Sequence, residues 1–585
     1  MPPGGLSFAL GDRFGPESNW GIYVAGNYGF TTNDRATATV TNPFENTGTY
    51  RRTRETIDLN GYVVVGYEYG AANEILSKTS ILRSTDDTTR QEVATDKEEV
   101  EINQVLLEYV ERQLVSQSFT GHNEFDLSGE THTLDWRLAY SRTDRDEPDR
   151  RQYQYRSGSL STTSVERRFS DLEEDSVDIG FDYVAPFAWG SGNYTEVQLG
   201  ALYSDKDRDV QLYRFGIRLG DLRDTSLSID EDLESILSYG NFALDRIRLA
   251  TSTTNTDSYN SAEETTAYYI NTNTEIGDSW ILGLGARYED FTQELSYPNQ
   301  ERSGNTLEND DWYPAASLVW KPTDEIQLRL GYSETVSYPG LIERSQSLSY
   351  DPTTDDPIFG NPNLVASAIE NFDARLEYYF SDAESISLAL FLKEIADPIE
   401  RALPDASGSA AAGITFRNQT SADLQGIEID FTKNVAESDS WTVFVSGNLS
   451  YIDSEVELSA NSLRLEGEAA NGRPLQGQSE WLGNVQFGFD HYPSNQKLTV
   501  LINYFDDRIF RVARGAATGS EIEVERFLLD ITYSKEFQMF GDLFTIELGI
   551  KNLLDEDVEY SQNNRIIESY QTGTSFGITL NYEFL

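Results

Sequence analysis

Alternation of apolar and polar residues with a period of two is the dominant pattern along this chain. Between residues 134 and 140, for example, Leu, Trp, Leu and Tyr alternate with Asp, Arg and Ala. Because successive side chains of a strand point to opposite faces, this pattern predicts β-strands with one apolar and one polar face. The pattern recurs at residues 177–183, 282–289, 326–332, 372–380, 386–392, 427–431, 441–451, 498–504, 527–533, 544–550 and 578–584.

The length and the polar faces of these predicted strands indicate a membrane protein rather than a packed core. The strands span roughly 10 to 15 residues, whereas strands of soluble proteins usually have about 5 to 6 and membrane strands about 9 to 11. Their polar faces carry charges in mid-strand, at Arg375, Glu377, Glu428, Asp430 and Glu547. A dry core would not accept these charges, but a water-filled lumen would. We therefore expect the polar faces to line a lumen and the apolar faces to contact lipid.

The strand ends and the connections fit the same interpretation. Aromatic residues gather at strand ends, as in the girdles that flank the lipid band of outer-membrane barrels. Short turns alternate with long acidic loops, which is the hairpin pattern of a barrel with periplasmic turns and extracellular loops. The long loops are expected near residues 32–54, 84–98, 145–170, 207–260, 296–310, 337–366, 398–420, 456–475, 509–522 and 556–569. Within the loop at 207–260, we expect a short helix at 226–240.

Counting the strands gives an odd number. If residues 99–125 form one long strand, short and long connections alternate without a break over about 21 strands. The first strand, at residues 4–14, and the last strand then both run toward the periplasm. Closed bacterial barrels have an even number of strands, so we expect an all-β, antiparallel up-and-down barrel of about 22 strands with one strand absent from the sequence. A large soluble β-sandwich or propeller is the alternative, but no blade-length repeat is present.

Composition narrows the possible partners. Acidic residues outnumber basic residues 98 to 45, and the resulting formal net charge of −53 argues against nucleic-acid binding. The chain has no cysteine, which excludes disulfides and thiolate metal sites. Apolar runs are far shorter than the roughly 18 residues that a spanning helix needs. The stretch MPPGGLSFAL lacks the basic and apolar regions of a signal peptide.

Signals for catalysis are weak. His122, His132 and His491 lie far apart without a carboxylate at ligand spacing, so we interpret all three as solvent-facing strand or turn residues. No phosphate-binding loop, Gly-x-Ser-x-Gly or HExxH motif occurs. The acidic clusters lack the spacing of a calcium-binding loop and are interpreted as solvated loop faces. We expect neither enzymatic activity nor a bound cofactor or metal.

Several segments resemble TonB-dependent outer-membrane receptors. The stretch LRLGYSETVSYPGLIERS is followed by GNPNLVASAIENFDARLEYYF, and later by LQGIEIDFTKNV and IELGIKNLLDEDVEY. Each motif is weak alone, but their order within long alternating strands makes the set specific. The residues that carry the resemblance are Tyr332, Pro339, Gly360, Asn361, Pro362, Leu364, Gly426, Glu428, Asn552 and Leu553.

The resemblance implies a receptor in the outer membrane of a Gram-negative bacterium that binds a scarce ligand in its outer loops and lumen. The implied ligands are ferric siderophores, cobalamin or oligosaccharides, with energy delivered by the TonB complex. We expect ligand contacts in the loops at 207–260 and 337–366. Lipid and lipopolysaccharide would surround the barrel. The resemblance also implies that the barrel-assembly machinery recognises the last strand, through Tyr582 and Phe584.

The N-terminal part typical of that family is not found in this sequence. No TonB box and no globular plug can be recognised, so we expect residues 1–585 to form the barrel alone. Two other functions stay open. One is a passive diffusion channel without a plug, whose acidic lumen would prefer cations. The other is a barrel enzyme or adhesin.

Overall fold

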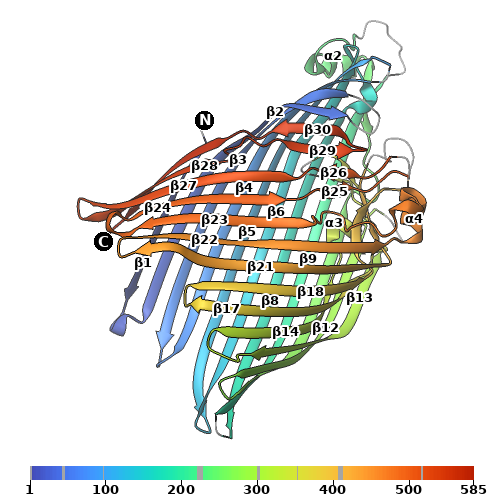
Figure 1. The fold of residues 1–585 in the computed structure, drawn as a ribbon. Helices are drawn as coiled ribbons and strands as arrows, with labels where there is room; N and C mark the ends of the chain where they lie inside the picture. Colours follow the sequence, from blue (N-terminus) through green and yellow to red (C-terminus); the bar gives the residue numbers. More distant parts are fainter. Residues whose placement is uncertain are drawn as a thin grey trace.

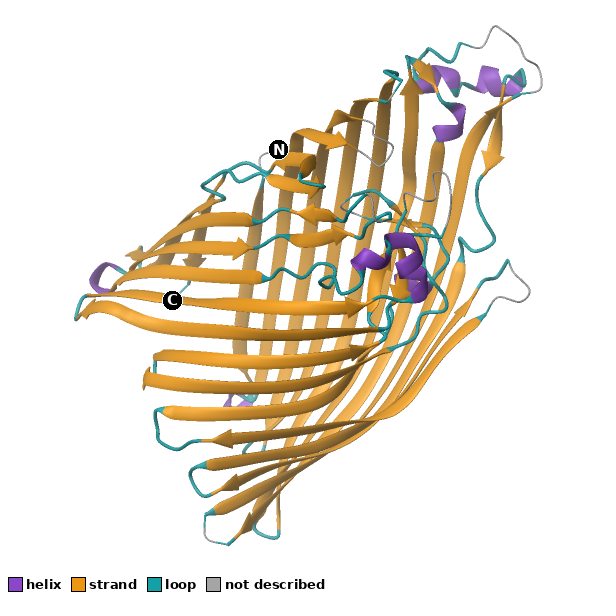
Figure 2. Ribbon diagram, turned by 45° about the vertical axis from the view of Figure 1, so that its right-hand side comes forward, coloured by secondary structure: helices purple, strands orange, loops and turns teal. Residues whose placement is uncertain are grey.

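The computed structural model describes residues 3–41, 47–96, 98–190, 192–220, 228–299, 304–351, 354–405, 413–515 and 518–584. Most of these residues belong to one large antiparallel sheet that curves around a central space (Figures 1 and 2). Loops with short helices gather at one end of this sheet, while tight turns connect the strands at the other end.

In the described residues, 21 long strands follow one another around the sheet, and each pairs antiparallel with the next. The predicted number, the up-and-down order and the single strand over 99–125 are confirmed. The strands are β1 (Gly4–Phe14), β2 (Trp20–Thr41), β3 (Thr47–Tyr69), β4 (Asn73–Thr95), β5 (Glu101–Leu127), β6 (Glu130–Arg156), β8 (Glu166–Trp189), β9 (Asn193–Leu219), β11 (Tyr259–Ile276), β12 (Trp280–Ser296), β13 (Asn305–Trp320), β14 (Ile326–Ser337), β17 (Ser367–Ser381), β18 (Glu384–Ala396), β21 (Ser421–Ser438), β22 (Trp441–Glu457), β23 (Trp481–His491), β24 (Gln496–Phe505), β27 (Arg526–Met539), β28 (Asp542–Lys551) and β31 (Ser575–Glu583).

Seven strands, β2 to β6, β8 and β9, are longer than predicted, with 22 to 27 residues each. Most of the loop expected at 84–98 belongs to β4, and residues 207–219 of the loop expected at 207–260 belong to β9. The apolar alternation stops where a strand leaves the lipid, because both of its faces then contact water. Backbone pairing with neighbouring strands continues regardless, so the strands extend beyond their apolar pattern.

The remaining elements lie in the loops. Helices α1 (Leu233–Ile236) and α2 (Tyr239–Ala243) overlap the short helix expected at 226–240. The others are η1 (Pro16–Ser18), β7 (Ser159–Leu160), η2 (Thr162–Ser164), β10 (Ile247–Thr251), α3 (Leu341–Arg344), β15 (Ser349–Tyr350), β16 (Pro357–Ile358), β19 (Ile399–Ala402), β20 (Thr415–Asn418), α4 (Ala460–Glu466), η4 (Glu468–Ala470), η5 (Tyr492–Ser494), β25 (Arg508–Arg511), β26 (Glu521–Glu523), β29 (Val558–Gln562) and β30 (Arg565–Gln571). Among the described residues, no helix is long and apolar enough to cross a membrane.

The apolar faces of the strands point outward, as predicted. Leu138, Ile179, Leu388 and Leu449 each expose between 42% and 48% of their surface. Buried apolar residues form only small clusters among strand ends and loops in the described chain. Such a distribution suits a barrel whose outer surface is covered by lipid, and it excludes a sandwich with a central core.

The first and last strands form the two edges of the sheet. In the part of the chain that the structure describes, β1 pairs only with β2 and β31 only with β28. Twenty successive antiparallel pairings separate them, so β1 and β31 run in the same direction. Near the loop end, β30 pairs with β2 through contacts such as Ala36 with Gln571, which brings the two ends of the sheet together there.

Candidate functional site

The loop between β14 and β17, residues 338–366, folds inward, and the motif residues predicted from the sequence hold it in shape. A Cβ atom on Gly360 would lie only 2.0 Å from the carbonyl oxygen of Ser345, so this close approach requires glycine. The Asn361 side-chain amide donates to the Phe416 carbonyl at 3.0 Å. Leu364 is 2% exposed and packs with Ile358 and Phe416. These residues therefore position the loop.

A buried arginine fastens the same loop to the barrel wall. Arg344, at the end of α3, is fully buried. Its guanidinium donates to the side-chain oxygen of Gln293 on β12 at 2.6 Å and to Asn305 on β13 at 2.7 Å. Since burying a charge without partners is costly, these bonds fix the start of the loop against β12 and β13.

The middle of the loop carries three carboxylates, each paired with an arginine from a different element. We call Asp351, Asp355 and Asp356 the acidic turn. Asp351 pairs with Arg401 of β19 at 2.7 Å, Asp355 with Arg150 of β6, and Asp356 with Arg511 of β25. Arg90 of β4 donates to the Thr354 carbonyl at 3.3 Å. Because β4, β6 and β25 belong to the large sheet and β19 pairs with β20 in a separate one, the turn links distant parts of the wall to a loop element.

Tyr350 stands beside the acidic turn. Its hydroxyl donates to Glu166 of β8 at 3.0 Å, and the Arg150 guanidinium lies 3.8 Å from the centre of its ring. Burial and the nearby Glu166 carboxylate raise the pKa of Tyr350 to about 12, so the hydroxyl remains a donor at neutral pH.

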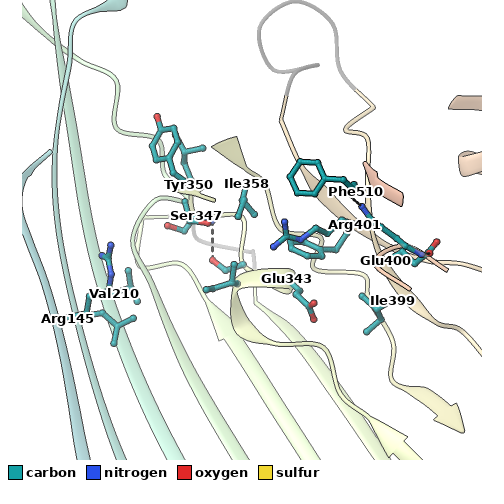
Figure 3. Close-up of a pocket in the computed structure, with 18 of the residues that line it drawn as sticks. Arg145, Val210, Glu343, Ser347, Tyr350, Ile358, Ile399, Glu400, Arg401 and Phe510 are labelled. Carbon is teal, nitrogen blue, oxygen red and sulfur yellow. Dashed lines mark hydrogen bonds between the residues drawn. The ribbon is translucent and has the colours of Figure 1, made fainter. Parts of the chain in front are cut away.

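A chamber of about 1240 Å³ opens between this loop and the walls. Its lining mixes charged side chains with apolar ones. Figure 3 shows Arg145 and Val210 on one side, loop residues in the middle, and Ile399, Glu400, Arg401 and Phe510 on the other side. This volume exceeds the roughly 300–1000 Å³ of common small-molecule pockets, so the chamber has room for a large ligand.

A smaller cavity of about 70 Å³ lies under the acidic turn and is rich in arginine. Six arginines line it together with five carboxylates, of which the barrel strands and β30 provide Asp86, Glu108 and Glu568 and the acidic turn provides Asp351 and Asp355. This cavity therefore carries one positive charge in excess. The arginines were missed because they are scattered over β2 to β6, and only the sheet register brings them to one side.

The acid excess lies partly on the outside of the barrel. Asp144, Glu173 and Asp209 are register neighbours on β6, β8 and β9. By strand alternation they share the outward face of β6 with Leu138. Net charge alone could not reveal this segregation.

The two predicted ligand loops contribute unequally to the chamber. The loop at 337–366 provides Tyr350, Ser347 and six further lining residues. From the range 207–260, only Arg208, Val210 and Tyr259 line it, and these lie on β9 and β11. In the described residues, α1 instead contributes Leu233 and Ile236 to an apolar cluster with Leu160 and Ile217.

None of the motif residues predicted from the sequence is among those that line the chamber. Their contacts support strands and turns. The Tyr332 hydroxyl donates to Glu334 at 2.5 Å, the Pro339 carbonyl accepts from Gln293, and the Ser450 hydroxyl donates to Glu428. Gly426 lies against the ring of Phe391.

The motif residues near the C-terminus also have structural contacts. Asn552 accepts a bond from the Glu556 amide at 3.0 Å, whereas its neighbour Leu553 is 39% exposed. On the last strand, Tyr582 donates to Asp542, and its ring lies 4.5 Å from that of Phe584. Their use by the assembly machinery stays a prediction.

The interpretation of the histidines needs correction. His132 is 6% exposed, and its ring lies 5.8 Å from that of Phe125 and 5.7 Å from that of Tyr183, so it does not face solvent. His122 lies 2.7 Å from Asp135, a cross-strand neighbour that sequence spacing cannot reveal. Among the described residues, no group of three or more potential ligands could hold a metal ion.

Comparison with known proteins agrees with this architecture. A curated relative, the probable TonB-dependent siderophore receptor PiuA of Acinetobacter baumannii, is 22% identical over 210 residues. That alignment covers 35% of this chain and 26% of the relative, so the chain matches about a quarter of that protein's length.

Solved structures show the same fold. The ferric preacinetobactin receptor BauA of Acinetobacter baumannii superposes with a TM-score of 0.60 at 13% identity, covering 99% of this chain and 78% of that chain. The ferric-catecholate import receptor Fiu of E. coli K12 gives a TM-score of 0.60 at 12% identity, with coverage of 99% and 81%. Both are receptors rather than enzymes. The family model described as TonB dependent receptor-like, beta-barrel matches residues 108–553, so the chain belongs to the TonB-dependent receptors of the outer membrane.

Proposed function

We propose that this protein is a receptor for the uptake of an iron–siderophore complex across the outer membrane. The observation that carries this proposal is the chamber of about 1240 Å³ between the inward-folded 338–366 loop and the barrel wall. Of the ligand classes that the family implies, siderophores are favoured because the similar proteins are named as receptors for them.

We further propose that TonB supplies the energy for uptake, as membership of the family implies. Among the described residues, no separate plug domain accompanies the barrel. The proposal therefore requires that a plug able to contact TonB be supplied outside these residues. A passive channel would need neither a plug nor TonB.

Removal of the inward-folded loop tests the proposal. Because Ser337 pairs with Ser367, residues 339–365 can be replaced by a short Gly/Ser linker that closes the hairpin. As a control, residues 220–246 can be replaced in the same way, because Leu219 pairs with Ile247. The purified proteins are titrated with iron(III) complexes of catecholate, hydroxamate and citrate chelators.

We expect the first replacement to weaken binding of the cognate complex at least about ten-fold, since it removes one wall of the chamber. The control replacement should bind within about two-fold of the parent. Uptake of radioactive iron by cells should depend on TonB. Uptake that continues without TonB, together with large stable conductance in planar bilayers, would instead establish a passive channel.

A further inference from the structure

We propose that the acidic turn is a tethered competitor that occupies an arginine-lined site for an anionic ligand. This inference rests on the proposed function and deepens it, because it assigns negative charge to the iron complex. It also makes entry of the ligand and displacement of the turn a single coupled event. The site consists of the arginines that pair with the turn and the arginine-rich cavity beneath it.

The turn holds its position through charges rather than through apolar packing. Each of its three carboxylates pairs with one arginine, and Arg90 binds the Thr354 carbonyl. In the described part of the loop, the buried aliphatic residues lie on the flanks of the turn, at Leu341 and Leu348 on one side and at Ile358 and Leu364 on the other. A guanidinium group binds a ligand carboxylate in the same geometry as it binds an aspartate. Each carboxylate of an anionic ligand can therefore take the place of one aspartate of the turn.

The balance of charge in the cavity under the turn favours an anion. Its walls carry six arginines and three carboxylates, which leaves three positive charges in excess before the turn is counted. Asp351 and Asp355 of the turn also line this cavity and reduce the excess to one. The excess of arginine in this cavity contrasts with the formal net charge of the whole chain, which is −53. A half-buried excess of like charge is costly without counter-charges, and the turn supplies them in the absence of ligand.

The cavity under the turn adjoins the chamber. Glu108, Arg112, Arg145 and Tyr350 line both of them. A complex bound in the chamber therefore already contacts the border of the arginine site. Displacement of the turn would join the two spaces and bring the anionic groups of the ligand to Arg90, Arg401 and Arg511.

The ligand class follows from this geometry. Arginines on four separate elements suit a compact complex that presents several anionic oxygens in different directions. Iron(III) held by carboxylate or catecholate groups has this chemistry, whereas a neutral trihydroxamate complex does not. We therefore expect discrimination by charge.

The experiment compares the parent with the triple variant Asp351→Asn, Asp355→Asn, Asp356→Asn. Asparagine keeps the size of the side chain and can still accept hydrogen bonds, so the loop that lines the chamber is retained. The matched control is Asp205→Asn, Asp207→Asn, Asp209→Asn, which changes the net charge equally on the outward face of β9. Binding of iron(III) citrate and of a neutral iron(III) trihydroxamate is measured with radioactive iron by equilibrium dialysis.

We expect the turn variant to bind iron(III) citrate about ten-fold more tightly than the parent, because the tethered competitor has lost its charge. The neutral complex should change by less than about two-fold, and the control variant should behave as the parent does. Adding Arg401→Gln and Arg511→Gln to the turn variant should reverse the gain, since these arginines would then be missing from the site.

Three results would overturn the inference: unchanged citrate affinity in the turn variant, an equal gain for the neutral complex, or a gain that survives loss of both arginines. Absence of binding by every variant would overturn it as well. A different result would contradict the proposed function. If the affinities shift as expected but cells take up no iron complex, the site stands and the transport role is wrong.

Discussion

At Gly360, the backbone of the 338–366 loop passes so close to Ser345 that no side chain fits. The nearest atom to an added Cβ would be the Ser345 carbonyl oxygen at 2.0 Å, and backbone atoms cannot move aside as a side chain can. Gly340, in the same loop, has its nearest such atom at 3.8 Å, the carboxylate of Glu343. Two glycines of one loop thus meet very different steric limits.

We predict that Gly360→Ala loosens this loop while the barrel stays folded. Overpacking of this kind costs about 1–3 kcal/mol, and here the cost falls on the loop alone. Hydrogen exchange of amides between residues 341 and 364 should become faster, with unchanged exchange in β14 and β17. Gly340→Ala is the control and should exchange like the parent. Equal behaviour of the two variants would contradict the steric argument.

At the scale of elements, a buried cluster of three charges joins α4 to β19. Arg473 donates to both carboxylate oxygens of Glu400, at 2.8 and 3.0 Å, and to Glu466 at 3.0 Å. The three side chains expose 7%, 4% and 2% of their surface. Arg473 thus hydrogen-bonds both carboxylates, and the charge of Arg417 also acts on Glu466. Burial raises the pKa of Glu466 above its ordinary value, although Arg473 opposes this shift.

We predict that Glu466→Gln stabilises this part of the loops at neutral pH. A raised pKa means that the folded state favours the neutral acid. In the parent, the stability that protonated Glu466 contributes is therefore fully present below the ordinary glutamate pKa and is lost as the pH rises through the raised pKa. The variant keeps this stability at every pH. Glutamine stays neutral and can still accept the bond from Arg473. Amide exchange in residues 460–475 should slow several-fold at pH 7 and match the parent below about pH 4. The exposed Glu468→Gln is the control, and an equal effect of both variants would refute the burial argument.

At the scale of the whole molecule, the sheet is asymmetric in length and has two edges. Strands β2 to β6, β8 and β9 extend far beyond the others, as the blue to cyan ribbons of Figure 1 show. In the described chain, β1 and β31 run in the same direction without pairing with each other, and every residue of both is exposed. Unpaired backbone groups are costly in lipid, and one strand of opposite direction would satisfy both edges.

We predict that such a strand stabilises the barrel. A segment of about ten alternating Leu and Thr residues, fused ahead of Gly4 through a two-residue turn, would run antiparallel to β1. The folded form should then resist heating in detergent to a higher temperature, as read from its mobility in gel electrophoresis. A fusion with the same composition in two blocks, five Leu then five Thr, should give no gain. If the two fusions behave alike, the edges do not accept a strand.

The sequence by itself determined the number of strands, their order and the face that each turns outward. These properties depend on alternation within a segment and on the lengths of connections, which are local. Where strands leave the lipid, that local signal disappears, and the lengths of β2 to β6, β8 and β9 were underestimated.

Only the tertiary structure decided the site. The pair Asp355 and Arg150 joins residues 205 positions apart, and Asp356 and Arg511 are 155 positions apart. The arginine-rich cavity likewise depends on the register of five neighbouring strands. The motif residues directed attention to the loop at 337–366, but they position its backbone, while its acidic turn makes the contacts across the lumen. Ion pairs between distant segments leave no periodic trace in a sequence, because each partner alone is an ordinary charged residue.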